Sequence, residues 1–301
     1  MQRRALNAAS VALLGIVGFT AAFIASPTVR AYSLIAAGRS SGECPADSLR
    51  SDEEKKRLSS EFRTELKLAK QDGDLQLWES PKGRFWMPGA TKDLLAFLLA
   101  EQAVKIYGKG DSGVRPGDIV FDCGAHVGVF TREALNAGAK LVVAIEPAPA
   151  NLECLRRNFA SEIADGRVIV YPKGVWDKED VLTFQVDNEN SARNQFVPGG
   201  AGPATQQIAV TTIDKVTAEL RLDRVDVIKM DIEGAEQKAL LGGQETIRKH
   251  KPRLAVCVYH GPTDAEQVPK VIAGLRSDYR RECGSCGISG MRLIPLTYLF
   301  R

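Results

Sequence analysis

The sequence has little of several features that would narrow its function. It contains only three histidines, and its 40 basic and 37 acidic residues are interspersed, which leaves a formal net charge of +3. A charge this small, without a long block of one sign, gives no support to a nucleic-acid-binding surface, and we predict no nucleic-acid partner. Internal repeats are also lacking. What remains is a chain long enough for one α/β domain with a sizeable core.

Cysteine is also sparse, and its pattern does not indicate a metal site. Cys123 and Cys257 lie in apolar runs and Cys154 in a predicted helix, so we interpret all three as small apolar core residues. Cys283 and Cys286 form a single C-x-x-C, with neither a second pair nor histidines nearby. Zinc is therefore weakly supported, and a disulfide or two thiols stay open. We interpret this segment as a flexible glycine-cysteine turn.

The most informative segment is Ile119–Val129, which reads IVFDCGAHVGV. It is typical of a buried parallel strand that ends in an acid, followed by a glycine-containing turn and a helix. Gly124 and Gly128 permit a tight bend and a close approach to a ligand. The acid, Asp122, stands where a dinucleotide fingerprint has its first glycine. A carboxylate favours a ligand with a cationic head group over a pyrophosphate, and S-adenosylmethionine is such a ligand.

Two further strand ends carry acids. The run Leu141–Ile145 ends at Glu146, which lies 24 positions after Asp122 and directly before Pro147. This spacing is typical of the acid that accepts hydrogen bonds from the ribose hydroxyls of a nucleoside cofactor. The segment Val225–Glu236 reads VDVIKMDIEGAE, and RLAVCVYH follows at 253–260.

Taken together, IVFDCGAHVG, AIEP, VIKMDIEGAE and VCVYH resemble the FkbM family of S-adenosylmethionine-dependent methyltransferases. The resemblance covers roughly residues 75 to 280, and IKMDIEGAE is its most specific part. It implies a methyltransferase fold and O-methylation of a sugar, polyketide or related hydroxylated molecule. Composition and periodicity alone indicate only an α/β cofactor-binding protein.

Individual roles follow from the strand ends and from the resemblance. Asp122 and the backbone near Gly124 are expected to hold the methionine part, Glu146 the ribose, and the segment after the third strand the adenine. Trp176 fits a core position equally well. The predicted cofactor-binding residues are Asp122, Gly124, Ala125, His126, Gly128, Glu146, Pro147, Val175 and Trp176.

Three residues are predicted to serve catalysis. Asp231 is expected nearest to the transferring methyl group, and His260 is a candidate general base, with a structural hydrogen-bonding role as the alternative. Glu233 is a further candidate, although a carboxylate there also suits a helix N-terminus. Magnesium held by Asp231 and Glu233 is possible, but one acid pair does not support it, and no metal site is predicted.

The N-terminus carries an uncharged apolar run, Ala5–Ala25, preceded by Arg3 and Arg4. As a helix it is long enough to cross a bilayer, so we predict a signal anchor. A signal peptide cleaved near Ala31 and a buried helix are the alternatives. The leading arginines favour an exported domain, whereas the cytosolic supply of S-adenosylmethionine favours the cytosolic face. We expect the cytosolic face, with export as the alternative.

Ahead of the core, a linker is predicted at 26–49, an amphipathic helix at 51–70, a hairpin at 75–87 and a helix at 93–107. These leading elements are expected to cover the cofactor cleft. The domain boundaries are then an anchor at 1–30, a linker at 31–50, covering elements at 51–115 and a cofactor-binding domain at 116–301.

The core is predicted to be α/β, a doubly wound Rossmann-like methyltransferase sheet. Strands are expected near 119–122, 141–145, 167–171, 225–230 and 253–259, with helices between them. Residues 181–186 and 207–212 are typical of an inserted hairpin. The segment 291–300 is expected to be an antiparallel edge strand, because Pro295 cannot donate to a central ladder.

The function predicted from these features is a membrane-anchored, S-adenosylmethionine-dependent methyltransferase. Its acceptor is expected to be a hydroxyl of a glycan, a lipid-linked saccharide or a secondary metabolite. One alternative is a membrane-tethered protein that binds the cofactor without catalysis. Another is an NAD-dependent oxidoreductase, which the acid in the first position of the turn disfavours.

Overall fold

The structure is a computed structural model, and it describes residues 26–40, 44, 48–89, 92–185, 191–196 and 205–301. The predicted signal anchor at Ala5–Ala25 lies outside this part of the chain. Within the described ranges, no helix combines the length and the apolar character that crossing a bilayer requires.

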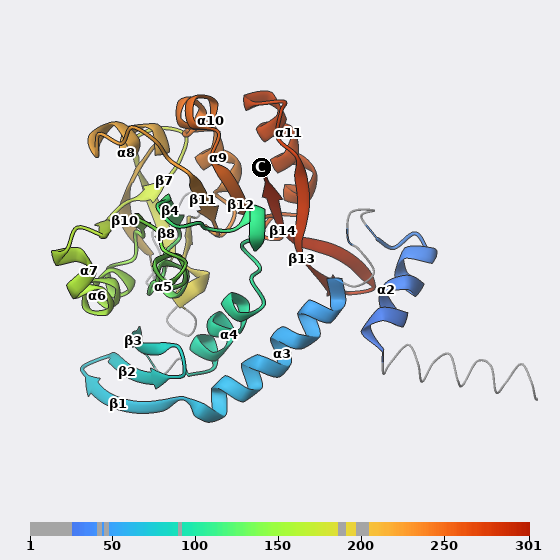
Figure 1. Ribbon diagram of the computed structural model, residues 1–301, viewed down its shortest axis with the longest axis horizontal. Helices are drawn as coiled ribbons and strands as arrows, with labels where there is room; N and C mark the ends of the chain where they lie inside the picture. Colours follow the sequence, from blue (N-terminus) through green and yellow to red (C-terminus); the bar gives the residue numbers. More distant parts are fainter. Residues whose placement is uncertain (1–25, 41–43, 45–47, 90–91, 186–190, 197–204) are drawn as a thin grey trace, which may run out of the picture.

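The core is a seven-stranded sheet in which β14 alone runs antiparallel to its neighbours (Figure 1). The five predicted core strands are confirmed to within about two residues at each end. In spatial order the strands are β13 (Arg281–Ser289), β14 (Arg292–Phe300), β12 (Arg253–Cys257), β11 (Val227–Met230), β4 (Ile119–Cys123), β5 (Leu141–Ile145) and β6 (Val168–Tyr171).

Both faces of this sheet are buried, as the nearly continuous apolar strands require. Alternate residues along one strand enter different clusters: Phe121 and Cys123 pack into one, and Val120 packs into another. Helices connect the parallel strands and cover the sheet. They are α5 (Val129–Asn136), α6 (Pro149–Asn158), α7 (Ala160–Ala164), α8 (Ile213–Glu219), α9 (Glu236–Leu241), α10 (Gln244–His250) and α11 (Asp264–Leu275).

The C-terminal strand β14 is antiparallel, as predicted, but its predicted edge position is wrong. It lies between β12 and β13, and β13 forms the edge. Pro295 is tolerated because β12 pairs only with residues from Thr297 to Phe300. On the other side Pro295 faces Cys286, next to an irregularity in the β13 register. The missing N–H therefore removes no hydrogen bond to β12.

The predicted inserted hairpin is confirmed as part of a second sheet. Strands β8 (Asp180–Gln185) and β10 (Thr205–Thr211) pair antiparallel. The short strands β7 (Gly174–Val175) and β9 (Gln195–Phe196) complete this sheet in the order β7-β10-β8-β9. A 3-10 turn, η2 (Ser191–Arg193), precedes β9 and returns the chain toward the carboxyl ends of the core strands.

The N-terminal elements α3 (Ser48–Glu65), β1 (Lys67–Asp72), β2 (Leu75–Ser80), β3 (Gly83–Pro88) and α4 (Lys92–Ala103) lie in the lower part of Figure 1. Helix α2 (Pro27–Ala36) lies at the right of that view, and the 3-10 turn η1 (Gly110–Ser112) follows α4. The β2–β3 hairpin is confirmed. Two expectations need correction. The predicted linker contains α2, which Ser26 caps, and the predicted helix at 51–70 ends at Glu65 because the chain turns into β1.

The C-x-x-C segment is part of β13, so its interpretation as a flexible turn is wrong. Cys286 forms a disulfide with Cys44, and the Cys283 Sγ lies 2.9 Å from the Cys286 Sγ. Leu293 donates a backbone hydrogen bond to Arg39 in the same region. The segment after α2 is therefore attached to the edge of the main sheet. Cys123, Cys154 and Cys257 are buried, as predicted.

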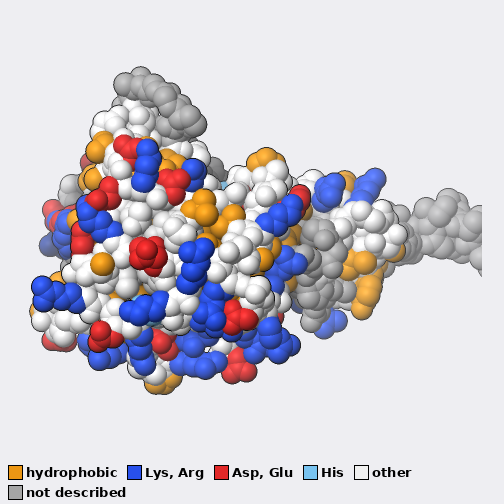
Figure 2. Space-filling view, turned by 90° about the horizontal axis from the view of Figure 1, so that it is seen from above, with side chains coloured by type: hydrophobic (Ala, Val, Ile, Leu, Met, Phe, Trp, Pro, Cys, Tyr) orange, Lys and Arg blue, Asp and Glu red, His pale blue; other side chains and the backbone are white. Residues whose placement is uncertain are grey.

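The surface reflects the mixed charge of the sequence. Figure 2 shows basic and acidic side chains close together over much of the visible face. Many of them pair; Asp278, for example, binds both Lys251 and Arg276.

Candidate active site

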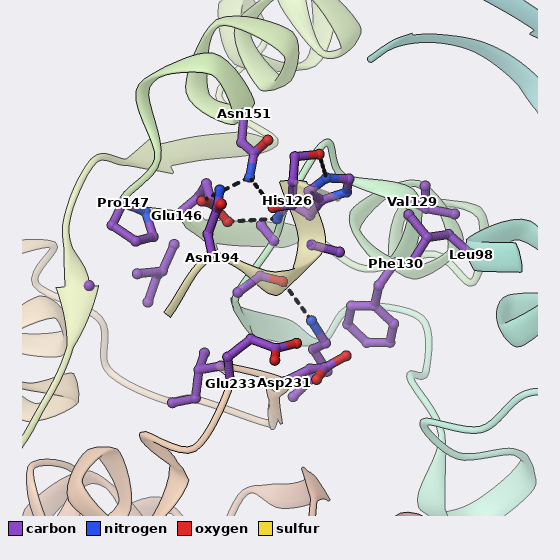
Figure 3. Close-up of a pocket in the computed structure, with 18 of the residues that line it drawn as sticks. Leu98, His126, Val129, Phe130, Glu146, Pro147, Asn151, Asn194, Asp231 and Glu233 are labelled. Carbon is purple, nitrogen blue, oxygen red and sulfur yellow. Dashed lines mark hydrogen bonds between the residues drawn. The ribbon is translucent and has the colours of Figure 1, made fainter. Parts of the chain in front are cut away.

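A cavity of about 660 Å³ opens at the carboxyl ends of β4, β5 and β11. Its size is ordinary for a small-molecule site. The turns after these strands form its floor, helix α4 forms one wall, and η2 and β9 form another (Figure 3). From the covering elements α4 contributes lining residues, whereas none of the described residues of β1, β2 or β3 does. Of the predicted cofactor-binding residues, Gly124, Ala125, His126, Glu146, Pro147 and Val175 line it.

The glycines of the first turn are required for close packing. Gly124 has a φ of +74°, and a Cβ there would lie 1.9 Å from the backbone oxygen of Asp231. Gly128 has a φ of +90°, and its Cβ would lie 2.2 Å from the Phe159 ring. Gly124 also lines the cavity, but Gly128 does not. The predicted contact between Gly128 and the cofactor is therefore replaced by a packing role against α6 and its end.

Asp122 was expected to contact the methionine part of the cofactor, and the structure places it elsewhere. It is fully buried and is absent from the cavity lining. Thr131 donates a hydrogen bond to its Oδ2, and the Lys229 Nζ lies 3.1 Å from its Oδ1. Its charge is thus neutralised within the core. The carboxylates that line the cavity are those of Asp93, Glu101, Glu146, Asp231 and Glu233.

Glu146 has the position expected of a ribose-binding acid. Its Oε2 accepts a hydrogen bond from the His126 N–H, and its Oε1 accepts from Ala148 N–H and the Asn151 amide (Figure 3). The side chain is held rigidly at the cavity wall, and about one lone-pair site, on Oε2, remains for a further donor. Burial raises the pKa of Glu146 to about 7, although these hydrogen bonds oppose that effect.

His126 is held in the first turn at a φ of +52°. Its Nε2 is hydrogen-bonded to the Ser191 hydroxyl at 2.8 Å. Burial, supported by the charge of Lys229, lowers the pKa of His126 to about 3. The ring is therefore neutral at physiological pH. His126 connects the first turn to η2 and closes one side of the cavity.

The segment that follows β11 is the most highly charged part of the cavity lining. Asp231 and Glu233 line the cavity, and both side chains are labelled in Figure 3. Tyr107 donates a 2.6 Å hydrogen bond to the Asp231 Oδ2. Burial raises the pKa of Asp231, but Lys229, His260 and Tyr107 outweigh it, so that pKa lies below its usual value. Asp231 is a carboxylate at neutral pH.

His260 lies behind these carboxylates and is not among the cavity-lining residues. Its Nδ1 is 2.9 Å from Glu236 Oε1, and its Nε2 is 3.4 Å from both Asp231 Oδ1 and Glu233 Oε1. Burial lowers the pKa of His260, but the three carboxylates outweigh it and raise that pKa to about 11. The imidazole ring is therefore protonated at neutral pH when no cation other than the proton is bound there. This arrangement argues against the predicted role of general base.

Trp176 also departs from its predicted role. It is absent from the cavity lining, and its ring packs edge-on against Phe196 at 5.7 Å. Phe196 lines the cavity instead. The core alternative stated for Trp176 therefore describes it better than the adenine contact does.

Several cavity-lining residues were not predicted from the sequence. Lys229 carried a visible signal, because a lysine within a buried apolar strand demands a partner. Glu101 on α4 is buried, pairs with Lys55 at 3.7 Å and lines the cavity. Burial raises the pKa of Glu101 to about 7. Tyr107 and Ser191 reach the site only through tertiary contacts, so no local pattern identifies them, whereas Asn151 lies only five residues after Glu146.

The parallel sheet, the cavity at its carboxyl edge and the rigid strand-end acid define an α/β protein with a methyltransferase-like fold. The family described as "Methyltransferase FkbM domain" matches residues 122–285, more than half of the 301-residue chain. The chain belongs to the FkbM methyltransferase family, as its motifs predicted.

Among curated proteins, the chain is similar to the 31-O-demethyl-FK506 methyltransferase FkbM of Streptomyces tacrolimicus. The two are 26% identical over 160 residues, which is 44% of this chain and 62% of that relative. The chain thus spans less than two thirds of the relative's length.

Two solved structures are also similar. Methyltransferase FkbM from Methylobacillus flagellatus KT has a TM-score of 0.47 at 20% identity, over 85% of this chain and 60% of that one. Trm5 of Methanocaldococcus jannaschii, in complex with adenosine, has a TM-score of 0.43 at 13% identity, over 77% and 56%. At these scores the two structures add nothing to the family assignment.

Proposed function

We propose that this protein transfers a methyl group from S-adenosylmethionine to a hydroxyl of a glycan, a lipid-linked saccharide or a secondary metabolite. The observation that carries the proposal is the geometry of Glu146. It is a rigid carboxylate at the end of the second parallel strand, it faces a cavity of about 660 Å³, and its Oε2 keeps an acceptor site for a ribose hydroxyl. Membership of the FkbM family supports the same reaction class.

The remaining cavity residues fit the other parts of this cofactor. Pro147 and Val175 offer an apolar surface next to Glu146, suited to the adenine ring. Asp231 and Glu233 place negative charge on the β11 side, next to the expected position of the transferring methyl group. When bound, the cofactor supplies an electrophilic methyl group on its sulfonium. The protein's main contribution is to hold the acceptor in line with that group.

An acceptor hydroxyl must also lose its proton. Asp231, fixed by Tyr107, is placed to orient that hydroxyl. Glu101, which lines the same cavity and has a pKa raised to about 7 by burial, is better suited to accept the proton than Asp231, whose pKa is lowered. We therefore assign orientation to Asp231 and proton acceptance to Glu101.

Calorimetric titration of the full-length chain with S-adenosylmethionine tests this proposal, with NAD as the comparison. We expect micromolar binding, about −8 kcal/mol, and no heat from NAD. Glu146→Gln keeps the size of the side chain but loses one acceptor oxygen, and should weaken binding at least tenfold. If S-adenosylmethionine gives no binding signal, or if NAD binds more tightly, the proposed cofactor is wrong.

Turnover then separates the enzyme from the non-catalytic alternative. A screen of hydroxylated acceptors with radiolabelled S-adenosylmethionine should yield a labelled product. Glu101→Gln should reduce that transfer while leaving cofactor affinity unchanged. Tight cofactor binding without transfer to any acceptor in the screen would favour a protein that binds the cofactor without catalysis.

A further inference from the structure

The side chains after β11 and β12 form a cluster in which the proposed function leaves His260 and Glu236 without a role. Asp231, Glu233 and Glu236 bring three carboxylates around one imidazole, that of His260. The Nζ of the nearby Lys229 contacts Asp122 and the backbone oxygen of Gly124. The cluster therefore concentrates negative charge at one edge of the cavity.

Glu236 fixes the orientation of the imidazole. It is almost fully buried, and it accepts backbone hydrogen bonds from Ile232 N–H and Gly234 N–H. Because Glu236 is held as an acceptor, the His260 Nδ1, 2.9 Å from its Oε1, is the donor in that contact. The Nε2 is then directed at Asp231 and Glu233. A carboxylate that orients a histidine in this way is typical of the outer shell of a metal site.

The atoms that face one another in the cluster lack hydrogen-bond partners. The His260 side chain is only 6% exposed, and neither its Nε2 nor the Asp231 Oδ1 has a hydrogen-bond partner among the described residues. Buried polar atoms are rarely left in this state. The Nε2 lies 3.4 Å from both Asp231 Oδ1 and Glu233 Oε1. Two ligand atoms each about 2.1 Å from one cation are separated by about 3.0–3.4 Å at octahedral to tetrahedral angles.

Glu233 is also held in an unusual backbone conformation. Its φ is +53°, which is rare for a residue with a side chain. That conformation accompanies a carboxylate that faces both the cavity and His260.

We propose that Asp231, Glu233 and the Nε2 of His260 bind one divalent cation, with Glu236 as the positioning residue. One nitrogen and two carboxylate oxygens suit a cation of the Mn²⁺ type. Asp231 and Glu233 line the cavity, whereas His260 and Glu236 lie behind them, so the remaining coordination positions face the cavity. The proposal departs from the sequence-based prediction, which included no metal site.

The cation defines a class of acceptor, and this part rests on the proposed function. Open positions on one ion favour a hydroxyl with a second oxygen on the adjacent carbon, as in a vicinal diol or an α-hydroxy carbonyl compound. Coordination lowers the pKa of the bound hydroxyl. The O–CH₃ bond then forms as the S–CH₃ bond breaks, the electron pair stays on sulfur, and the proton passes to Glu101. A carboxylate of ordinary basicity suffices for that step.

The test is titration of the EDTA-treated, full-length chain with Mn²⁺, followed by loss of the free-ion EPR signal. We expect one ion per chain with micromolar affinity. Glu233→Gln and Asp231→Asn should each weaken binding at least tenfold, whereas Glu245→Gln, an exposed residue on α10, should leave it unchanged. Circular dichroism verifies folding, and Glu233→Gln is the primary variant because its side chain is partly exposed.

Further measurements distinguish failure of this proposal from failure of the proposed function. Adenosine affinity, measured without metal, should be the same in wild type and Glu233→Gln. Adenosine binding without Mn²⁺ binding, or Mn²⁺ binding that survives both substitutions, overturns the cation site alone. Mn²⁺ binding without any affinity for adenosine or S-adenosylmethionine supports the ion site and overturns the proposed function.

Bound Mn²⁺ should also enhance water-proton relaxation, because water occupies its open coordination positions. If no enhancement is seen, the ion has no open positions, and the proposed acceptor class is wrong as well.

Discussion

The Lys229 Nζ lies 3.1 Å from the Asp122 Oδ1, and the two side chains are 5% and 0% exposed. Asp122 lies near the carboxyl end of strand β4, directly opposite Lys229 on the neighbouring strand β11, so this ion pair joins the two central strands beneath the cavity. Burial lowers the pKa of Lys229, but Asp122 and Asp231 outweigh it and keep the ammonium charged. The acid expected to meet the cofactor thus holds the lysine that borders the cofactor cavity.

This pairing predicts a large loss of stability when one partner is removed. Lys229→Met should lower the free energy of unfolding by about 3–5 kcal/mol, because it leaves Asp122 buried without a counter-charge. Asp122→Asn combined with Lys229→Met should recover part of that loss. Urea denaturation of the two variants checks the expectation. Equal stability of the single variant and wild type would mean that the pair contributes nothing.

The affinity for nucleosides should depend on pH through Glu146. Burial raises the pKa of this carboxyl to about 7. Only the ionised form accepts its three hydrogen bonds from the protein and still leaves an acceptor site on Oε2 for a ribose hydroxyl, so affinity should rise with pH. Between pH 6 and pH 8 the ionised fraction grows about tenfold, and adenosine, which does not titrate there, should bind up to about tenfold more tightly.

Matched variants assign this pH dependence to one group. Glu146→Gln should bind adenosine weakly at both pH values, without the rise. Glu101→Gln should keep it, although burial raises the pKa of Glu101 to about 7 as well. His126 stays neutral throughout, because its pKa is lowered to about 3. A rise that persists in Glu146→Gln would move the ribose site elsewhere.

Gly124 should tolerate alanine far less well than Gly73 does. Both have positive φ angles, +74° and +57°, so both substitutions carry the same kind of backbone cost, about 1–2 kcal/mol. Gly73 has open space around it, whereas a Cβ on Gly124 would overlap the Asp231 backbone oxygen. We expect Gly124→Ala to lose about 1–3 kcal/mol more than Gly73→Ala. Thermal unfolding in parallel measures the difference, and equal losses would show that β11 shifts freely.

Much of the fold could be predicted from the sequence because its core strands are continuous apolar runs that end in acids. Glu146 was placed correctly at the cavity because its position depends on strand spacing alone. Asp122 and Trp176 were not, because their partners, Lys229 and Phe196, come from distant parts of the chain. Tyr107 and Glu101 were not predicted for the same reason, because they contact the site only after α4 packs over it.

The strand order at the C-terminus shows the same limit. Pro295 was a valid signal for a missing ladder hydrogen bond, but it could not tell an edge strand from an inner strand with a short partner. The hydrogen-bonded length of β12, which ends opposite Thr297, decides that question. Strand length is set by the loop after β12, and no feature of β14 itself encodes it.

The Cys44–Cys286 disulfide gives the last prediction, because it joins residues 242 positions apart and attaches the N-terminal segment to β13. Closing so long a loop restricts the unfolded chain, so its loss should lower the free energy of unfolding by about 2–5 kcal/mol. Reductant should therefore destabilise wild type and Cys283→Ser but leave Cys44→Ser unchanged. Denaturation with and without reductant measures this difference in stability, on protein whose free thiols were blocked during isolation.

Blocking free thiols in intact cells tests the compartment of this disulfide, since disulfides persist in oxidising environments. An intact bond would favour the exported orientation, and fully blocked thiols would favour the cytosolic face on which the predicted cofactor is made.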